Sequence, residues 1–313
     1  MTGTVRGDGF PGYGLFTIGT GALRATVSPL GATLVSLQFH GRELVLGYDC
    51  GDAYLAGQDY VGAVVGRYAN RIGGASFCLD GQRFRLDANE HGNTLHGGSN
   101  GFSKRVFTVE KATEMALTLR MEDEDGSNGF PGTMLATVTY RAEGDALTVT
   151  FWGRSTRDTV YGPTSHAYFC LNDSRDCRDT RLFIRADRYL SVDDALLPKE
   201  MLPTEDRFGF TDLRRIDGDY DHCFVLENGP ADAPAMVTEG DGIRMELFTD
   251  YPAIQLYTGQ GLHAPLRPYQ GFAAEPEFLP DSPNHPEYPS CVLRAGEEFH
   301  KCIRYRFSRT EEG

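Results

Sequence analysis

A strict alternation of large apolar and polar residues restricts the fold of this chain more than any other feature of its sequence. Large apolar side chains occupy every second position in residues 115–121, 147–151, 243–247 and 303–307. A period of two places these side chains on one face of a β-strand. Residues 142–145, Ala-Glu-Gly-Asp, precede one of these segments and predict the four-residue turn of a hairpin. We therefore expect a mostly antiparallel, all-β protein.

Helical periodicity is weak throughout the chain. The best candidate, residues 60–68, gathers its apolar residues in one block and contains Gly62 and Gly66. No Ser/Gly-rich or Pro-rich linker and no internal repeat interrupts the alternating segments. The expectation is one sandwich-like β domain over residues 1–313, and two packed β domains remain the alternative because the chain is long for one domain.

The net charge, the N-terminal residues and the cysteines indicate which partners and which cellular location to expect. Asp and Glu outnumber Lys and Arg, 44 to 30, which gives a net charge of -14. Such a surface repels phosphate backbones and anionic lipids, so we expect neither nucleic acid nor a membrane as a partner. Residues 1–14 lack the apolar segment of a signal peptide, which predicts a cytoplasmic location. The seven cysteines form no CxxC pair and are expected to be mostly buried free thiols.

The sequence contains fragments of cofactor and metal motifs, but they lack the neighbouring elements or the spacing that such sites require. The glycine pattern of residues 7–12 matches a dinucleotide fingerprint, but it contains Pro11 and follows no strand. His91 with His96, or the Asp-His-Cys sequence of residues 221–223, offers ligand-type side chains without the spacing of a zinc motif. We therefore expect no cofactor and no metal.

Two glycine-containing segments carry polar groups that suit a sugar. Residues 66–73 contain Asn70 and Arg71, whose amide and guanidinium could bind neighbouring hydroxyl groups. Residues 93–98 place His96 before two glycines, which allow close approach of backbone and ligand. Taken alone, residues 66–73 are better interpreted as a turn with a surface arginine, and residues 93–98 equally well as an Asn-containing turn with an incidental histidine.

Three further polar residues lie in apolar or aromatic surroundings. His166 follows Pro-Thr-Ser and precedes Ala-Tyr-Phe, and an imidazole that titrates near neutrality suits a general acid. Asp221 lies just before a strand that we expect to begin at Phe224. Glu275 follows small and apolar residues, so burial should raise its pKa toward that of a general base, and Glu277 shares its face if the strand continues. A core histidine, a capped turn and a surface glutamate are the plainer interpretations.

The segments together resemble the aldose 1-epimerase, or galactose mutarotase, family. The resemblance extends from about residue 31 to about residue 307 and implies a galactose-mutarotase-like β super-sandwich, mostly antiparallel. It rests on six motifs in order, which are GRYANRI (66–72), NTLHGG (93–98), TSHAYF (164–169), YDHCFVL (220–226), QLYTG (255–259) and EPEFLPDSPNHPEYP (275–289).

The resemblance also implies a function and a role for each matched position. The implied activity interconverts the α and β anomers of free aldohexoses such as galactose or glucose, without a cofactor, in a monomer or homodimer. Glu275 is the implied base at the anomeric hydroxyl, His166 the acid at the ring oxygen, and His96 its neighbour there. The residues implied to bind sugar hydroxyls are Asn70, Arg71, Asp221 and Gln255.

Some departures leave the choice of sugar open. Ser165 and Cys170 replace the asparagines usual in the family, and residues 198–200 shorten a common stretch. An epimerase for maltose or for a hexose 6-phosphate is a possible alternative, and the phosphate would need an arginine cluster such as Arg67 with Arg105.

Two alternatives assume a different activity. A non-catalytic sugar-binding protein of the same fold would be expected to lack the acid or the base, and this chain has both His166 and Glu275. A glycoside hydrolase would need two carboxylates across the scissile bond, for which Asp221 and Glu275 are candidates.

Overall fold

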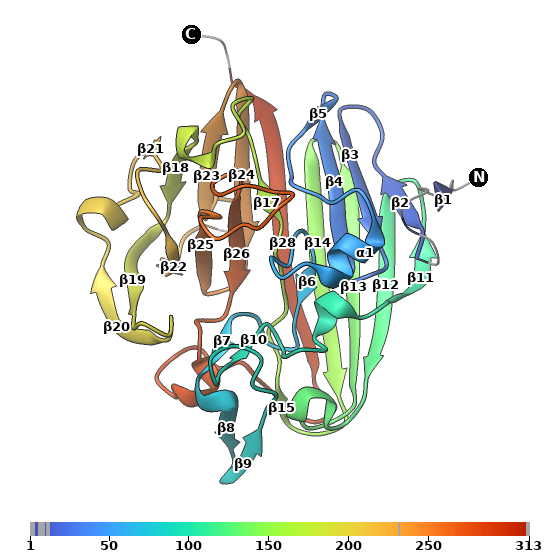
Figure 1. Ribbon diagram of the computed structural model, residues 1–313, viewed down its shortest axis with the longest axis vertical. Helices are drawn as coiled ribbons and strands as arrows, with labels where there is room; N and C mark the ends of the chain where they lie inside the picture. Colours follow the sequence, from blue (N-terminus) through green and yellow to red (C-terminus); the bar gives the residue numbers. More distant parts are fainter. Residues whose placement is uncertain (1–3, 6–9, 11–12, 231, 311–313) are drawn as a thin grey trace.

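The computed structural model describes residues 4–5, 10, 13–230 and 232–310. The glycines of the dinucleotide-like pattern lie outside these described residues. Two large antiparallel sheets and a smaller one account for most of the fold (Figure 1). The expectation of a mostly antiparallel β protein is confirmed.

The largest sheet has nine strands in the order β11-β12-β13-β14-β28-β24-β23-β18-β21. Its strands are β11 (Thr108–Ala112), β12 (Ala116–Asp123), β13 (Met134–Glu143), β14 (Ala146–Ser155), β28 (Glu298–Arg309), β24 (Ile243–Thr249), β23 (Met236–Gly240), β18 (Arg181–Ile184) and β21 (Arg214–Arg215). The apolar positions of the four alternating segments are buried here, apart from Met115, which is half-buried and precedes β12; Leu119, Val149, Met245 and Tyr305 are each at 0% exposure. The alternation therefore identified strands and their inward faces correctly.

A six-stranded sheet carries most of the polar motifs, and a five-stranded sheet lies near the N-terminus. The strands of the six-stranded sheet are β17 (Tyr168–Phe169), β26 (Phe272–Glu277), β25 (Ala253–Tyr257), β22 (Asp221–Leu226), β19 (Ala186–Val192) and β20 (Pro198–Pro203). Those of the five-stranded sheet are β1 (Thr4–Val5), β2 (Leu15–Ile18), β3 (Leu23–Ser28), β4 (Thr33–Phe39) and β5 (Arg42–Glu43).

Short elements connect and cover the sheets. The two-stranded pairs are β6 (Val64–Val65) with β16 (Thr164–Ser165), β7 (Arg71–Ile72) with β10 (Thr94–Leu95), β8 (Ser76–Leu79) with β9 (Gln82–Arg85), and β15 (Thr159–Val160) with β27 (Val292–Leu293). The helical segments are α1 (Gly51–Ala56) and the 3-10 turns η1 (Gly73–Ala75), η2 (Phe102–Lys104), η3 (Ser127–Gly129), η4 (Cys177–Asp179), η5 (Asp206–Phe208) and η6 (Ser282–Asn284). Within the described residues, no helix has the length and apolar character needed to cross a membrane.

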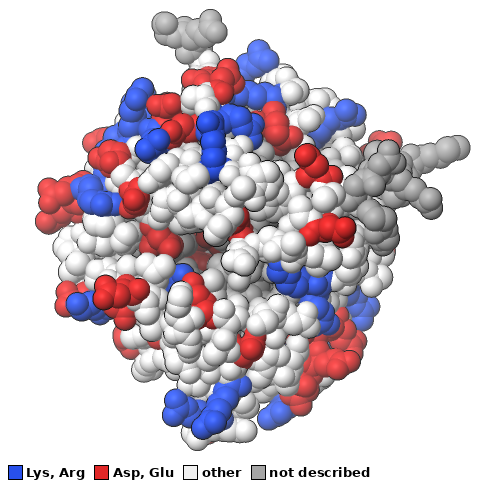
Figure 2. Space-filling view, viewed as in Figure 1, with Lys and Arg blue, Asp and Glu red and all other residues white. Residues whose placement is uncertain are grey.

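One apolar cluster fills the space between the sheets. It joins Leu147 and Tyr305 of the nine-stranded sheet to Phe224 and Phe272 of the six-stranded sheet, and Leu37 of the five-stranded sheet belongs to it as well. Burial of this much apolar surface is the main force that holds the sheets together. Acidic and basic side chains are interspersed over the face seen in Figure 2, which shows no single basic patch there.

Some local expectations need correction. Glu143 pairs with Ala146, so the hairpin loop has two residues rather than four, and Gly144 supplies the positive φ of 57°. Strand β22 begins at Asp221 itself and not at Phe224. All seven cysteines are free, and four of them are buried, whereas Cys78 is exposed.

Candidate active site

The strand register of the six-stranded sheet brings three of the expected site residues to one face. Gln255 of β25 is the cross-strand neighbour of both Cys223 and Glu275. Since side chains alternate along a strand, Asp221 shares the face of Cys223, two residues away. Asp221, Gln255 and Glu275 therefore point to the same side although they come from three strands.

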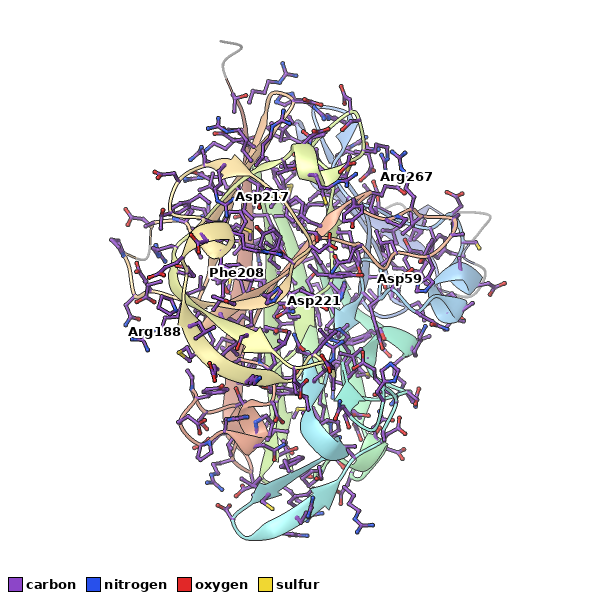
Figure 3. All side chains as sticks on the ribbon, turned by 60° about the vertical axis from the view of Figure 1, so that its left-hand side comes forward. Asp59, Arg188, Phe208, Asp217, Asp221 and Arg267 are labelled. Carbon is purple, nitrogen blue, oxygen red and sulfur yellow. The ribbon has the colours of Figure 1, made fainter. Side chains whose placement is uncertain are left out.

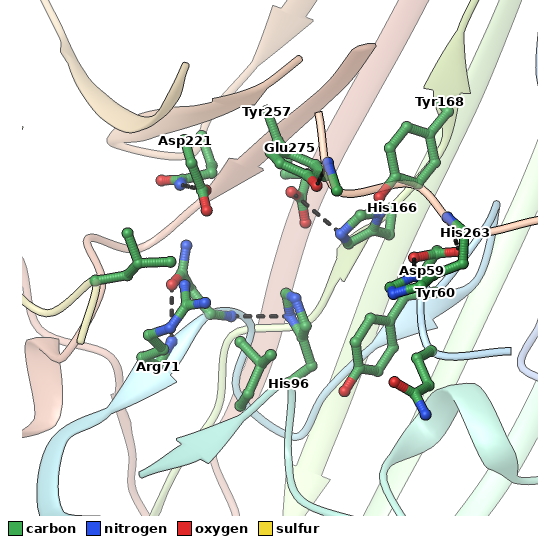
Figure 4. Close-up of a pocket in the computed structure, with 16 residues that line it drawn as sticks. Asp59, Tyr60, Arg71, His96, His166, Tyr168, Asp221, Tyr257, His263 and Glu275 are labelled. Carbon is green, nitrogen blue, oxygen red and sulfur yellow. Dashed lines mark hydrogen bonds and ion pairs between the residues drawn. The ribbon is translucent and has the colours of Figure 1, made fainter. Parts of the chain in front are cut away.

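A pocket of about 250 Å³ lies over this face. The segments at its walls are far apart in the sequence, with Asp221 beside the yellow β19–β20 region and Asp59 beside the blue N-terminal part in Figure 3. Figure 4 shows the pocket with its lining side chains. The lining includes every expected site residue, namely Asn70, Arg71, His96, His166, Asp221, Gln255 and Glu275.

Glu275 and His166 form a buried pair at the centre of the pocket. The Oε1 atom of Glu275 lies 3.5 Å from the Nε2 atom of His166 (Figure 4). Burial raises the pKa of Glu275 well above its usual value, and the nearby charges of Glu277 and Asp221 add to the rise. This agrees with the expectation of a base with a raised pKa.

The titration expected for His166 is wrong. Burial lowers the pKa of His166 to about 4, and the charge of Asp59 opposes this only in part. The imidazole is therefore neutral at physiological pH. The rings of Tyr60 and Tyr168, with centroids 5.9 and 5.0 Å from that of His166, contribute to the surroundings that exclude water.

The loops that carry Asn70 and His96 are packed closely together. Strands β7 and β10 pair Arg71 with Leu95, and the backbone N–H of Asn70 donates to Nδ1 of His96 at 3.1 Å. A Cβ atom at Gly97 would overlap the carbonyl oxygen of Gly66, so this approach requires glycine. Burial lowers the pKa of His96 well below its usual value, and the charges of His166 and Arg71 act in the same direction.

Arg71 and Asp221 are held by other polar side chains. The guanidinium of Arg71 donates from Nε and Nη2 to the two carboxylate oxygens of Glu90, each at 2.7 Å. Burial alone would lower the pKa of Arg71, but the hydrogen bonds with Glu90 and the charge of Asp221 raise it. Gln255 donates from Nε2 to Oδ1 of Asp221 at 2.6 Å, and burial raises the pKa of Asp221. Both side chains are thus fixed before a ligand arrives.

Sequence reasoning did not single out several residues of the pocket. His263 contacts Asp59 through Nδ1 at 2.7 Å across the rim, although 204 positions separate them. Tyr60 packs edge-on against His96 with ring centroids 4.6 Å apart, and Tyr257 is the cross-strand neighbour of Asp221. Only the position of Tyr257 in the QLYTG motif gave a signal, because the other residues lie in irregular segments.

The arginine cluster suggested for a phosphate is not present in the pocket. Arg67 is 1% exposed and donates from Nε to Oδ2 of Asp123 at 2.7 Å. Arg105 binds the other oxygen of Asp123 at 3.1 Å. Both guanidiniums are therefore committed to one structural carboxylate, away from the pocket.

The donor atoms of His96, His166 and Glu275 lie within 4.8 Å of one another, which raises the question of a metal. Nδ1 of His96 accepts the N–H of Asn70, so the neutral ring carries its proton on Nε2. Neither nitrogen of His96 then has a free lone pair for a metal ion. The chemistry of this set suits proton exchange better than metal binding.

Comparison with known proteins agrees with this geometry. A family model described as aldose 1-epimerase matches residues 14–306. The chain is 33% identical to the aldose 1-epimerase of Escherichia coli (strain K12), over 96% of both chains, and 31% identical to the human galactose mutarotase, over 94% of this chain and 93% of that one. The solved structure of an aldose epimerase homologue from C. elegans superimposes with a TM-score of 0.91 at 27% identity, covering 96% of this chain and 100% of that one. The chain is therefore an isomerase that belongs to the aldose 1-epimerase family.

Proposed function

We propose that this protein interconverts the α and β anomers of free aldohexoses such as galactose and glucose by acid–base ring opening at C1. The observation that carries the proposal is the buried pair of Glu275 and His166, 3.5 Å apart in a pocket with fixed groups for hydroxyls. Relatives named aldose 1-epimerase and galactose mutarotase support the reaction class.

The proposed reaction moves two protons. Glu275 removes the proton from the hydroxyl on C1 while His166 gives a proton to the ring oxygen, and the bond between C1 and that oxygen breaks. The products are an aldehyde at C1 and a hydroxyl at C5. Rotation about the C1–C2 bond turns the other face of the aldehyde to the C5 hydroxyl. In ring closure His166 takes its proton back and Glu275 returns a proton to the oxygen on C1, so both residues are regenerated.

The ionisation states of Glu275 and His166 fit this exchange. Burial disfavours a carboxylate at Glu275 and an imidazolium at His166, so the pair favours its neutral arrangement. Transfer of one proton across the 3.5 Å gap gives the carboxylate and the imidazolium that ring opening needs. A bound sugar, whose hydroxyls are strong hydrogen-bonding groups, lowers the cost of that transfer.

The substrate is proposed to be held at its hydroxyls by Arg71, Asp221 and Gln255. Nη1 of Arg71 makes no hydrogen bond within the described part of the chain, and Oε1 of Gln255 is buried without a partner there. A buried acceptor without a partner is costly, so Oε1 of Gln255 favours a polar ligand. Because Arg67 and Arg105 are bound to Asp123, a hexose 6-phosphate is the weaker candidate.

The test is the rate of anomerisation of freshly dissolved α-galactose and α-glucose, followed by polarimetry or NMR. We expect rates well above the buffer rate with both sugars, and slower rates with glucose 6-phosphate; maltose measures whether a larger substrate is accepted. Sugar binding by calorimetry with no acceleration over buffer would indicate a non-catalytic binding protein. Release of reducing sugar from aryl glycosides would indicate a hydrolase.

A further inference from the structure

Glu277 is a buried carboxylate that the proposed reaction does not use. It lies two residues beyond Glu275 on the same face of β26 and is 0% exposed, but it does not line the pocket. Its Oε1 accepts a hydrogen bond from Nδ2 of Asn70 at 2.8 Å. Its Oε2 is buried without a partner within the described residues. A carboxylate in this position is costly, which calls for a compensating role.

Asn70 links Glu277 to the pocket. Its backbone is left-handed, with φ at 63°, and its Oδ1 accepts the N–H of Arg71 at 2.8 Å. The side chain is thus held at both ends, by Glu277 and by the following peptide. Its own backbone N–H donates to Nδ1 of His96, and its carbonyl accepts the N–H of His96, both at 3.1 Å.

The bond from Asn70 determines which nitrogen of His96 carries the proton. A neutral imidazole has one N–H and one acceptor nitrogen. Because Nδ1 accepts, Nε2 must donate, and His96 offers the pocket a hydrogen-bond donor. The left-handed backbone of Asn70 directs its own backbone N–H toward Nδ1 of His96. The contacts that fix the Asn70 side chain therefore also affect which nitrogen of His96 is protonated.

We propose that Glu277 is a positioning residue, which holds Asn70 so that its backbone N–H keeps His96 as a donor through Nε2. The consequence for catalysis rests on the proposed function, in which His96 assists near the ring oxygen. The tautomer of His96 is a property of the protein alone and is measurable without a sugar.

The experiment compares Glu277→Leu with Glu277→Gln. Leucine removes the acceptor of the Asn70 amide, whereas glutamine retains a carbonyl oxygen at that place. In the ¹⁵N-labelled protein, long-range ¹H–¹⁵N spectra distinguish a ring protonated on Nε2 from one protonated on Nδ1. We expect His96 to keep the Nε2–H form in wild type and Glu277→Gln, and to become a mixture in Glu277→Leu. Glu143→Leu, at an exposed glutamate, is the matched control.

Activity gives a second, independent readout. We expect Glu277→Leu to lower kcat by about 10- to 100-fold, as for loss of a residue that orients a catalytic group, and Glu277→Gln to restore most of it. If Glu277 acts through His96, then adding Glu277→Leu to His96→Ala should cost no further activity. Losses that multiply in the double variant would overturn the proposal.

The outcomes separate this proposal from the proposed function. An unchanged His96 tautomer in folded Glu277→Leu overturns the positioning role, whatever the activity. A wild-type protein that does not accelerate anomerisation overturns the proposed function, and the tautomer still decides the role of Glu277. If Glu277→Leu does not fold, Asn70→Gly removes the same hydrogen bond from the other side, suits the left-handed backbone at this position, and must give the same mixture of tautomers.

Discussion

Nε2 of His166 lies 3.5 Å from Oε1 of Glu275, and burial moves the pKa values of the two groups in opposite directions. The pKa of the acid rises and that of the imidazole falls, so both changes favour the uncharged pair. A pair balanced in this way can exchange a proton with a ligand at little cost, because neither member is stabilised strongly as an ion.

Replacing Glu275 should remove catalysis without removing binding. Glu275→Gln keeps the shape of the side chain but cannot accept the proton from the C1 hydroxyl. We expect kcat to fall by about 10²–10⁴-fold, the usual contribution of a general base, while galactose still binds in calorimetry. Glu298→Gln makes the same change at an exposed site and should be silent. A kcat within threefold of wild type would exclude Glu275 as the base.

The pH dependence should have a limb at which activity falls as pH rises. Ring opening uses the one proton that Glu275 and His166 share in their neutral arrangement, and this proton is lost as pH rises through the raised pKa of Glu275, so kcat/KM should decline there. His166 has a pKa of about 4, so histidine ionisation should add no limb between pH 6 and 8. Rates extrapolated to zero buffer concentration measure this profile.

Glu277→Gln should move that limb in a defined direction. The charge of Glu277 is the second cause of the raised pKa of Glu275, after burial. Removing it lowers the pKa of Glu275, so the variant should lose activity at a lower pH than wild type as pH rises. A limb that stays in place or moves to higher pH contradicts this coupling.

Loss of the base should stabilise the fold at alkaline pH. The pKa of Glu275 is higher in the folded protein than its unfolded value of about 4.3. The contribution of Glu275 to the free energy of unfolding is therefore fully present below about pH 4.3 and is lost as pH rises through the folded-state pKa. Glu275→Gln avoids this loss. We expect its Tm to exceed that of wild type by about 2–4 °C at pH 8 and to match it near pH 4. Equal Tm values at both pH values would contradict the burial argument.

Removing the buried guanidinium of Arg67 should destabilise the protein strongly. Arg67→Met leaves Asp123 with only its contact to Arg105 and leaves the carbonyls of Pro131 and Glu124 without their donor. We expect a loss of about 3–5 kcal/mol in the free energy of unfolding, measured with denaturant. Arg141→Met, at an exposed ion pair, should cost less than about 1 kcal/mol.

The sequence predicted the structure best where a short residue pattern by itself determines the local structure. Alternation identified strands β12, β14, β24 and β28 of the nine-stranded sheet because their apolar side chains face one core. The motifs were sufficient to predict seven residues of the pocket, since each motif carries at least one side chain there. The domain organisation over residues 1–313 stays a prediction.

Other properties depend on neighbours that no local pattern reveals. The ionisation of His166 depends on burial by side chains from distant segments, such as Tyr60, and was predicted wrongly. Arg67 and Arg71 lie in one short motif, yet one binds Asp123 in the core and the other reaches the pocket. The contact of Asp59 with His263 joins two loops without any regular pattern.

The strand order of the nine-stranded sheet also affects how the protein is made. Strand β28 lies between β14 and β24, so residues 298–309 join strands that were synthesised much earlier. Until this segment leaves the ribosome, β14 and β24 each present an unpaired edge to other chains, which invites aggregation. The two parts of the nine-stranded sheet therefore become one only after residues 298–309 have been added to the chain.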